Sequence, residues 1–165
     1  PEGDVLRRYA LAADATDATT VIRITSDCPL IDPQVSGAVI GLARATGSSL
    51  ARTAHDRGYP HGYDTELMSA ELLRVADRDA IDPFDREHVT PFLWNRPDEF
   101  PAVFLDRRPD RRSWRLTVDT PVDYRFCSAL YEKLYPRKPL FGIGDLEQLF
   151  ATDPVLLSRG SELDC

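Results

Sequence analysis

Hydrophobic and polar positions along this chain follow two periods, one typical of helices and the other of strands. Apolar residues recur at helical spacing over residues 5–13, and Asp4 is placed to cap the first turn. The β-branched run at 19–25 then has the length and composition of a strand. The segment 32–47 opens with Asp-Pro and closes with Gly, which predicts a second helix.

The same alternation continues to the end of the chain. Further strands are expected at 48–53, 63–68, 102–106 and 113–118, and further helices at 69–79, 85–95 and 120–135. The strands at 102–106 and 113–118 are expected to pair as a hairpin or as neighbours, and Pro91 favours a break in the helix at 85–95. Two short helical patches follow in the tail, residues 137–165. The alternation predicts an α/β fold with a mixed, mainly parallel sheet, in one domain over residues 1–165.

Composition and charge narrow the classes of function. The chain has 165 residues, a formal net charge of −7 and a sequence pI near 4.9. Such an acidic chain repels phosphate backbones, so we expect no nucleic-acid partner, whereas a bound divalent cation would admit small anionic ligands. The sequence contains no apolar run of membrane-spanning length, and no signal peptide opens the chain. With its widely spaced Cys28, Cys127 and Cys165, these features predict a cytoplasmic protein with no membrane association.

Two aspartates share the same sequence setting. Asp27 and Asp119 each lie just beyond the carboxyl end of an expected strand and before a new helix. In open α/β sheets this edge is where ligands bind, and two carboxylates that converge there suit Mg²⁺. The alternative is that each aspartate only forms a turn, or that Asp119 caps the helix opened by Pro121.

Several segments also resemble a known family, the spore coat polysaccharide biosynthesis cytidylyltransferase-like proteins, which are related to the acylneuraminate and deoxy-octulosonate cytidylyltransferases. The central match is the run 21–32, Val-Ile-Arg-Ile-Thr-Ser-Asp-Cys-Pro-Leu-Ile-Asp. Further matches occur in the family's order at 4–9, 62–66, 86–91 (Arg-Glu-His-Val-Thr-Pro) and 115–124. The family usually has glycine where this chain has Ser26.

The resemblance implies a three-layer nucleotide-diphospho-sugar transferase fold of the GT-A-like type and a reaction between CTP and a sugar or sugar acid. Mg²⁺ would be the cofactor, with Asp27 and Asp119 as its catalytic carboxylates. Substrate-binding side chains would come from Arg23, Asp64, Glu66, Glu87 and His88. Each has a plainer alternative: Arg23 pairs with an acid, Asp64 and Glu66 form a solvated strand face, and Glu87 and His88 pair locally at a helix start.

The resemblance further implies that the chain lacks the first βαβ portion of the fold, including the glycine- and arginine-containing loop that holds the nucleotide. Two other functions therefore stay open: a nucleotide-sugar-dependent glycosyltransferase, and a truncated binding domain without catalysis. The segment Asp77-Arg78-Asp79 has the Asp-x-Asp pattern of metal-dependent glycosyltransferases, but it is expected at a helix end. A homodimer is also open, although no dimer face is legible in the sequence.

Overall fold

The structure is a computed structural model that describes residues 3–161, and its contacts divide the chain into two compact units. Unit 1 comprises residues 1–23, 40–52 and 66–104, and unit 2 comprises residues 24–39, 53–65 and 105–165. The expectation of a single domain over 1–165 stays a prediction. Among the described residues, no helix has the length and apolar character needed to span a bilayer.

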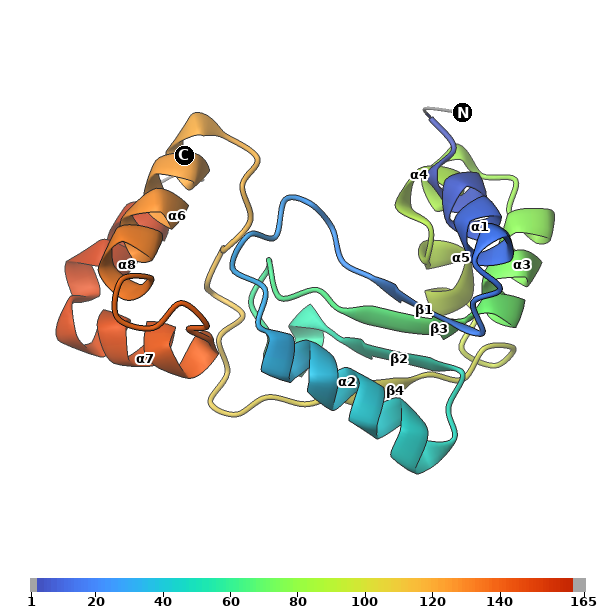
Figure 1. Cartoon of the computed structure of the whole chain (residues 1–165), viewed down its shortest axis with the longest axis horizontal. Helices are drawn as coiled ribbons and strands as arrows, with labels where there is room; N and C mark the ends of the chain where they lie inside the picture. The colour runs from blue at the N-terminus through green and yellow to red at the C-terminus, as the bar shows by residue number, and fades with distance from the viewer. Residues whose placement is uncertain (1–2, 162–165) are drawn as a thin grey trace. The chain divides into compact units, whose positions relative to one another are not determined.

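Unit 1 is built on a sheet with the strand order β1-β3-β2-β4 (Figure 1). The strands are β1 (Thr20–Arg23), β2 (Leu50–Thr53), β3 (Glu66–Ser69) and β4 (Val103–Leu105). Its helices are α1 (Val5–Ala15), α3 (Ala70–Asp79), α4 (Pro83–His88) and α5 (Pro91–Trp94), together with the second half of α2 (Pro33–Thr46). Pro91 does break the expected helix, which forms as α4 and α5.

The expectation of a mainly parallel sheet is wrong for the pairings of β3. This strand runs antiparallel to β1 on one side and to β2 on the other. A parallel pair needs a crossover connection, usually a helix, but β2 and β3 are joined by a loop whose regular structure is one 3₁₀ turn at His55–Arg57. The chain therefore returns antiparallel beside β2.

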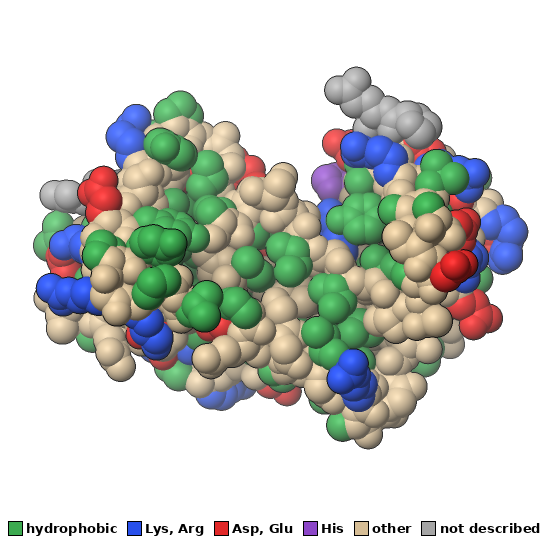
Figure 2. All heavy atoms as spheres, in the orientation of Figure 1, with side chains coloured by type: hydrophobic (Ala, Val, Ile, Leu, Met, Phe, Trp, Pro, Cys, Tyr) green, Lys and Arg blue, Asp and Glu red, His purple; other side chains and the backbone are tan. Residues whose placement is uncertain are grey.

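Alternating side chains of the sheet serve two layers of unit 1. Val21 and Met68 face a core that contains buried residues of α1, α3 and α5, including Leu6, Leu73 and Leu93. Ile22 and Leu67 instead line a hollow with residues from the second half of α2. Figure 2 shows hydrophobic side chains at the surface around β1, where Ile22 is 40% exposed.

Unit 2 has a core of helices and irregular segments. Its helices are α6 (Pro121–Leu134), α7 (Ile143–Thr152), α8 (Pro154–Ser161) and the first half of α2. Trp114 packs edge-on against Phe150 with ring centroids 4.8 Å apart, which brings an extended segment and the tail into one core. The tail patches expected from the sequence are therefore real helices.

The segment 113–118 forms no strand in the described structure, and it does not pair with β4. Its ladder contact is an isolated parallel bridge between His61 and Arg115. The amide of Leu116 donates to the carbonyl of His61 at 2.8 Å. The expectation that 102–106 and 113–118 form a hairpin or neighbouring strands is therefore wrong, because the second segment finds its backbone partners in other loops of unit 2.

Candidate active site

The two predicted metal-binding aspartates lie on neighbouring chain segments of unit 2. The amide of Val118 donates to the carbonyl of Asp27 over 2.8 Å, and Asp119 follows directly. Segments joined by such a bond run about 5 Å apart. The Asp27 residue is half-buried and Asp119 is exposed, so neither is closed off from solvent. The geometry thus brings together two residues that the sequence placed at two strand ends.

The helix start after Asp119 is capped by its own residues. The Thr120 hydroxyl accepts from the Asp123 amide, and Asp123 Oδ2 accepts from the amides of Asp119 at 3.0 Å and Thr120 at 2.8 Å. Burial alone would raise the pKa of Asp123, but these hydrogen bonds and the charge of Arg115 outweigh burial and lower it. The alternative that Asp119 caps this helix is wrong, and its carboxylate is free of that task.

Asp119 instead forms an ion pair with Arg115, which lies four residues earlier in the extended segment before α6. Arg115 also approaches Asp123 Oδ1 at 3.7 Å. The side chains of Arg115 and Asp119 are 40% and 49% exposed, so water screens this pair and its contribution to stability is small. A cation at Asp119 would compete with Arg115 for the same carboxylate.

Asp64 belongs to the same part of unit 2. The preceding Gly62 has φ +99°, and a Cβ there would meet the backbone of Leu116 at 2.6 Å, so only glycine fits this close approach. Asp64 Oδ2 accepts from the Gly62 amide at 3.1 Å. Because β3 begins at Glu66, Asp64 lies before the strand, and the expected alternation of these two acids along one strand face does not occur.

The pKa of the Cys28 thiol responds to the acidic residues of this region. Burial raises the pKa of its thiol to about 11, the Thr25 hydroxyl opposes this shift, and the charges of Asp27 and Asp64 add to it. The sulfur lies 3.0 Å from the Thr25 hydroxyl and 3.9 Å from Asp27 Oδ1. Cys28 is a small buried side chain, and a neutral thiol is a poor nucleophile.

The carboxylates of Asp27 and Asp119 suit a hard cation that needs only one or two protein ligands. Among the described residues, no group of three or more His, Cys, Asp or Glu side chains is arranged to hold a metal ion. Mg²⁺ uses one or two protein carboxylates and takes its other ligands from phosphates and water. Asp27 and Asp119 fit that pattern, whereas a site made wholly of protein ligands is not present in the described chain.

A cavity of unit 2 is lined by the residues that precede the two aspartates, while Asp27 and Asp119 themselves are not in its lining. Its volume is about 480 Å³, and its lining includes Ser26 and Val118, the residues directly before Asp27 and Asp119. The wall is mainly apolar and includes Tyr131, whose hydroxyl donates to the carbonyl of Pro29 at 2.6 Å. The volume is that of a small-molecule site.

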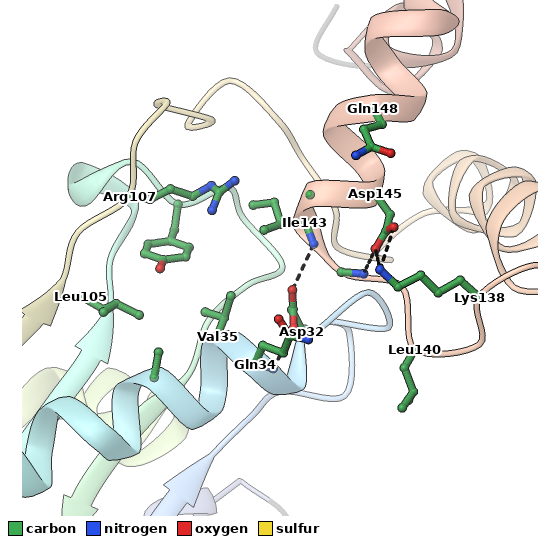
Figure 3. Close-up of a pocket in the computed structure, with 14 residues that line it drawn as sticks. Asp32, Gln34, Val35, Leu105, Arg107, Lys138, Leu140, Ile143, Asp145 and Gln148 are labelled. Atoms are coloured by element: carbon green, nitrogen blue, oxygen red, sulfur yellow. Dashed lines mark hydrogen bonds and ion pairs between the residues drawn. The ribbon is translucent and has the colours of Figure 1, made fainter.

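A second cavity of unit 2, of about 440 Å³, lies at the starts of α2 and α7 (Figure 3). Asp32 caps both helices, because its Oδ1 accepts from the Gln34 amide at 2.8 Å and its Oδ2 from the Ile143 amide at 3.0 Å. A Cβ on Gly142 would meet Asp32 Oδ2 at 2.2 Å, so a larger residue there would displace the Asp32 carboxylate from its capping position. The Asp32 carboxylate is occupied by these two hydrogen bonds, and the lining of this cavity includes neither Asp27 nor Asp119.

Glu66 is the centre of a buried polar cluster in unit 1. It accepts from Arg23 at 2.7 Å, from the Thr90 hydroxyl at 2.9 Å and from the Trp94 indole at 3.0 Å. Its side chain is only 10% exposed, and Arg52 approaches it at 3.9 Å. Arg23 thus pairs with an acid, and Glu66 is held by the protein and does not form a solvated face.

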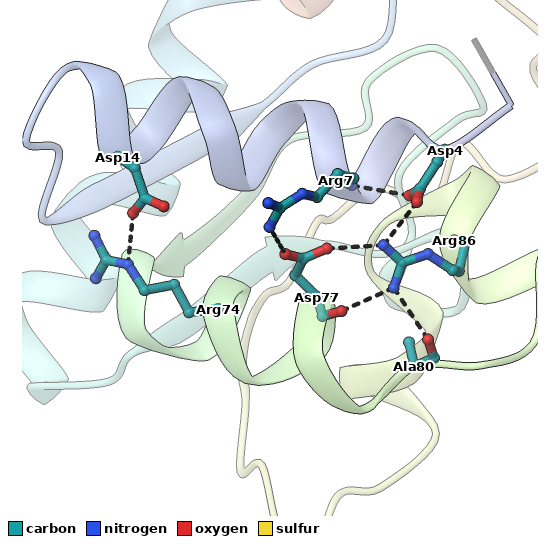
Figure 4. A network of polar contacts seen from close by, with 7 residues as sticks. All are labelled: Asp4, Arg7, Asp14, Arg74, Asp77, Ala80 and Arg86. Carbon is teal, nitrogen blue, oxygen red and sulfur yellow. Dashed lines mark hydrogen bonds and ion pairs between the residues drawn. The ribbon is translucent and has the colours of Figure 1, made fainter. Parts of the chain in front are cut away.

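Glu87 and His88 are the last two residues of α4, so the alternative that places them at a helix start is wrong. Both are exposed, and the His88 ring packs against Phe84 with centroids 4.3 Å apart. Arg86, one residue earlier, makes the larger structural contribution, because it joins Asp4 and Asp77 (Figure 4). The roles of Arg86, Thr90 and Trp94 were not predicted from the sequence, although Arg86 and Thr90 lie within a matched segment.

Comparison with known proteins gives a consistent relationship. No family model matches the chain. The spore coat polysaccharide biosynthesis protein SpsF of Bacillus subtilis is 32% identical over 136 residues, which cover 80% of this chain and 55% of that protein. The uncharacterized protein MJ1063 of Methanocaldococcus jannaschii is 27% identical over 151 residues, covering 90% of this chain and 58% of that protein.

A solved structure agrees with these relatives. A cytidylyltransferase from Leptospira borgpetersenii superposes with a TM-score of 0.88 at 25% identity, covering 94% of this chain and 65% of that one. The chain spans somewhat more than half the length of the curated relatives it matches. The motifs, the fold and these relatives agree: the chain belongs to the spore coat polysaccharide biosynthesis cytidylyltransferase-like family.

Proposed function

We propose that the protein is a Mg²⁺-dependent cytidylyltransferase that activates a sugar or sugar acid with CTP for surface polysaccharide synthesis. The observation that carries the proposal is the hydrogen bond from Val118 to the carbonyl of Asp27, which sets two matched aspartate motifs side by side. The likeness to SpsF and to a solved cytidylyltransferase supports the reaction class.

In this reaction a hydroxyl oxygen of the sugar attacks the α-phosphorus of CTP. The new oxygen–phosphorus bond forms as the bond to the β-phosphate oxygen breaks, pyrophosphate leaves, and the hydroxyl proton passes to a base or to water. Mg²⁺, held by Asp27 and Asp119, would supply charge neutralisation for the triphosphate. The protein's own part is mostly positioning.

The other proposed substrate-binding residues differ in their positions and contacts. Asp64 lies in unit 2, and its charge, like that of Asp27, raises the pKa of the Cys28 thiol. We therefore assign Asp64 to the edge of the site. The side chains of His88 and Glu87 are exposed and do not cap α4. We assign both residues to sugar recognition, with His88 as hydrogen-bond donor or proton carrier. Glu66 and Arg23 bind each other, so their contribution is to the architecture.

The glycosyltransferase alternative loses its main sequence feature. The Asp-x-Asp segment ends α3, Asp77 is bound by Arg7 and Arg86, and Asp79 is bound by Arg78. These carboxylates neutralise arginines, so the segment offers no open pair for a metal ion.

The test is pyrophosphate release by the complete protein with CTP, ATP, GTP or UTP, in the presence of Mg²⁺ and a panel of sugars that includes N-acetylneuraminate and deoxy-octulosonate. We expect release with CTP and at least one sugar, with a CMP-sugar as the second product. Sugar transfer from a nucleotide sugar without pyrophosphate release would favour the glycosyltransferase. Inactivity with every nucleotide and sugar of the panel would reject the proposal.

A further inference from the structure

Arg115 holds two carboxylates of unit 2 with different nitrogens of one guanidinium group. Its Nη2 donates to Asp119 Oδ2, while its Nε lies 3.7 Å from Asp123 Oδ1. Asp119 is one of the two carboxylates that we propose as metal ligands, and Asp123 belongs to the α6 cap. A positive side chain therefore neutralises the same carboxylate that a divalent cation would use.

The protein holds these two carboxylates with different firmness. The Asp123 side chain is 6% exposed, and its Oδ2 accepts from the amides of Asp119 at 3.0 Å and Thr120 at 2.8 Å. Within residues 3–161, the Asp119 carboxylate has no hydrogen bond or ion pair other than that with Arg115. The contact between Arg115 and Asp119 can thus be broken without disturbing the cap, whereas Asp123 stays in place beside Nε.

The backbone of Arg115 is anchored, while its side chain is partly exposed. Arg115 forms a parallel bridge with His61, and the next amide, that of Leu116, donates to the His61 carbonyl at 2.8 Å. The Arg115 side chain is 40% exposed, so part of the guanidinium already faces water. A rotation about the Nε contact carries Nη1 and Nη2 away from Asp119 and leaves the guanidinium near Asp123.

A guanidinium and a divalent cation compete for the Asp119 carboxylate, because like charges a few ångströms apart repel each other. A nucleoside triphosphate that arrives with the cation brings negative oxygens to the same place, and arginine binds phosphate oxygens through paired hydrogen bonds. We infer that Arg115 is a further substrate-binding residue, which leaves Asp119 when the cation binds and donates to the phosphates of CTP. This inference rests on the proposed function and adds Arg115 to its site.

The exchange of partners predicts opposite effects of one substitution. Without nucleotide, Arg115 competes with the cation, so Arg115→Gln should tighten the binding of Mn²⁺, used as the probe, by about two- to fivefold, the worth of an exposed ion pair. With nucleotide, the same variant lacks a phosphate contact, so KM for CTP should rise by about tenfold. KM for the sugar should stay unchanged, because the lost contact is made to CTP.

The experiment measures Mn²⁺ binding to the complete protein by electron paramagnetic resonance of the free ion, without nucleotide, and pyrophosphate release over a range of CTP concentrations. It compares Arg115→Gln with Asp119→Asn, which should weaken Mn²⁺ binding because a proposed ligand is lost. Arg112→Gln is the matched control, because it removes the same charge from an exposed pair with Asp110 in the same unit. The control should leave both the Mn²⁺ affinity and KM for CTP unchanged.

The Mn²⁺ measurement separates the inference from the proposed function. Weaker binding in Asp119→Asn, together with an unchanged or lower affinity in Arg115→Gln, would overturn the inference while the proposed metal site stands. An unchanged KM for CTP in Arg115→Gln, or equal effects of Arg115→Gln and Arg112→Gln, would overturn it as well. Unchanged Mn²⁺ binding in Asp119→Asn would reject the metal assignment, and a protein without CTP-dependent release fails the proposed function; in either case the role of Arg115 falls too.

Discussion

The Val118 amide donates to the Asp27 carbonyl at 2.8 Å, which joins two motif segments that are far apart in the sequence. The bond is not part of a regular strand pair. It is made where the extended segment before α6 passes the loop after β1, within unit 2. Asp119 and Asp27 are thus brought together by loops that are packed against the α6–α7 core.

Gly62→Ala tests the close approach that shapes this region. The substitution places a Cβ at 2.6 Å from the Leu116 backbone in a residue with φ +99°. We expect a loss of unfolding free energy of about 1–3 kcal/mol, measured by urea unfolding. Gly41→Ala is the control, because nothing lies within 4 Å of its Cβ position in α2, and a gain of about 0.5–1 kcal/mol is expected. Equal effects would contradict the assignment.

The Glu66 cluster makes a prediction about coupling. Glu66→Ala leaves Arg23 and Arg52 near a lost carboxylate, and we expect a cost of about 3–5 kcal/mol. The same substitution should cost clearly less in an Arg23→Met background, because no charge is then stranded beside it. Asp14→Ala removes the exposed pair with Arg74 (Figure 4) and should cost at most about 1 kcal/mol. Additive effects at positions 23 and 66 would show that the pair is not coupled.

Asp123 gives the α6 cap a defined pH dependence. Its pKa in the folded protein is below the value of about 3.9 for an unfolded chain. The ionised cap therefore adds stability that is fully present above pH ~4 and is lost as the pH falls through the lower folded pKa. The difference in unfolding free energy between the protein and Asp123→Asn should be constant from pH 7 to 5 and shrink below pH 4. A difference that persists unchanged to pH 3 would contradict the low pKa.

The rate of alkylation of the Cys28 thiol tests whether this residue is an activated nucleophile. Burial raises its pKa to about 11, so almost all of the thiol is protonated at pH 8. Cys127 is also buried, and its pKa is likewise about 11. We expect iodoacetamide at pH 8 to leave both peptides unmodified in the folded protein and to alkylate them fully in 8 M urea, as read by mass spectrometry. Rapid alkylation of Cys28 in the folded protein would show an activated thiol.

The local parts of the fold are readable from the sequence because their causes are local. Asp4, Asp32 and Thr120 cap the helices they were expected to start, and Pro91 breaks the helix it was expected to break. Each of these features depends on residues within one turn of the chain. Asp27 lies in the loop after β1 as expected, whereas Asp119 follows a segment that was expected to be a strand and forms none in the described structure.

The features that the sequence did not predict depend on contacts between residues far apart in the chain. The insertion of β3 between β1 and β2 follows from a loop connection that the alternating pattern does not specify. The burial of Glu66 depends on Thr90 and Arg23, which lie 24 and 43 residues away in the sequence. A charged residue that alternates with apolar neighbours predicts a solvated face unless such partners are known, so the buried cluster could not be foreseen.

Mg²⁺-dependent turnover by Asp27→Asn and Asp119→Asn in the complete protein, with thermal unfolding measured in parallel, tests the proposed metal site most directly. The exposed Asp98→Asn serves as the matched control. Each site variant should lose at least about a hundredfold in pyrophosphate release from CTP. Its melting temperature should be close to that of the control, because the exposed Asp119–Arg115 pair contributes little to stability. Unchanged turnover in both site variants would contradict the assignment of the metal to these two aspartates.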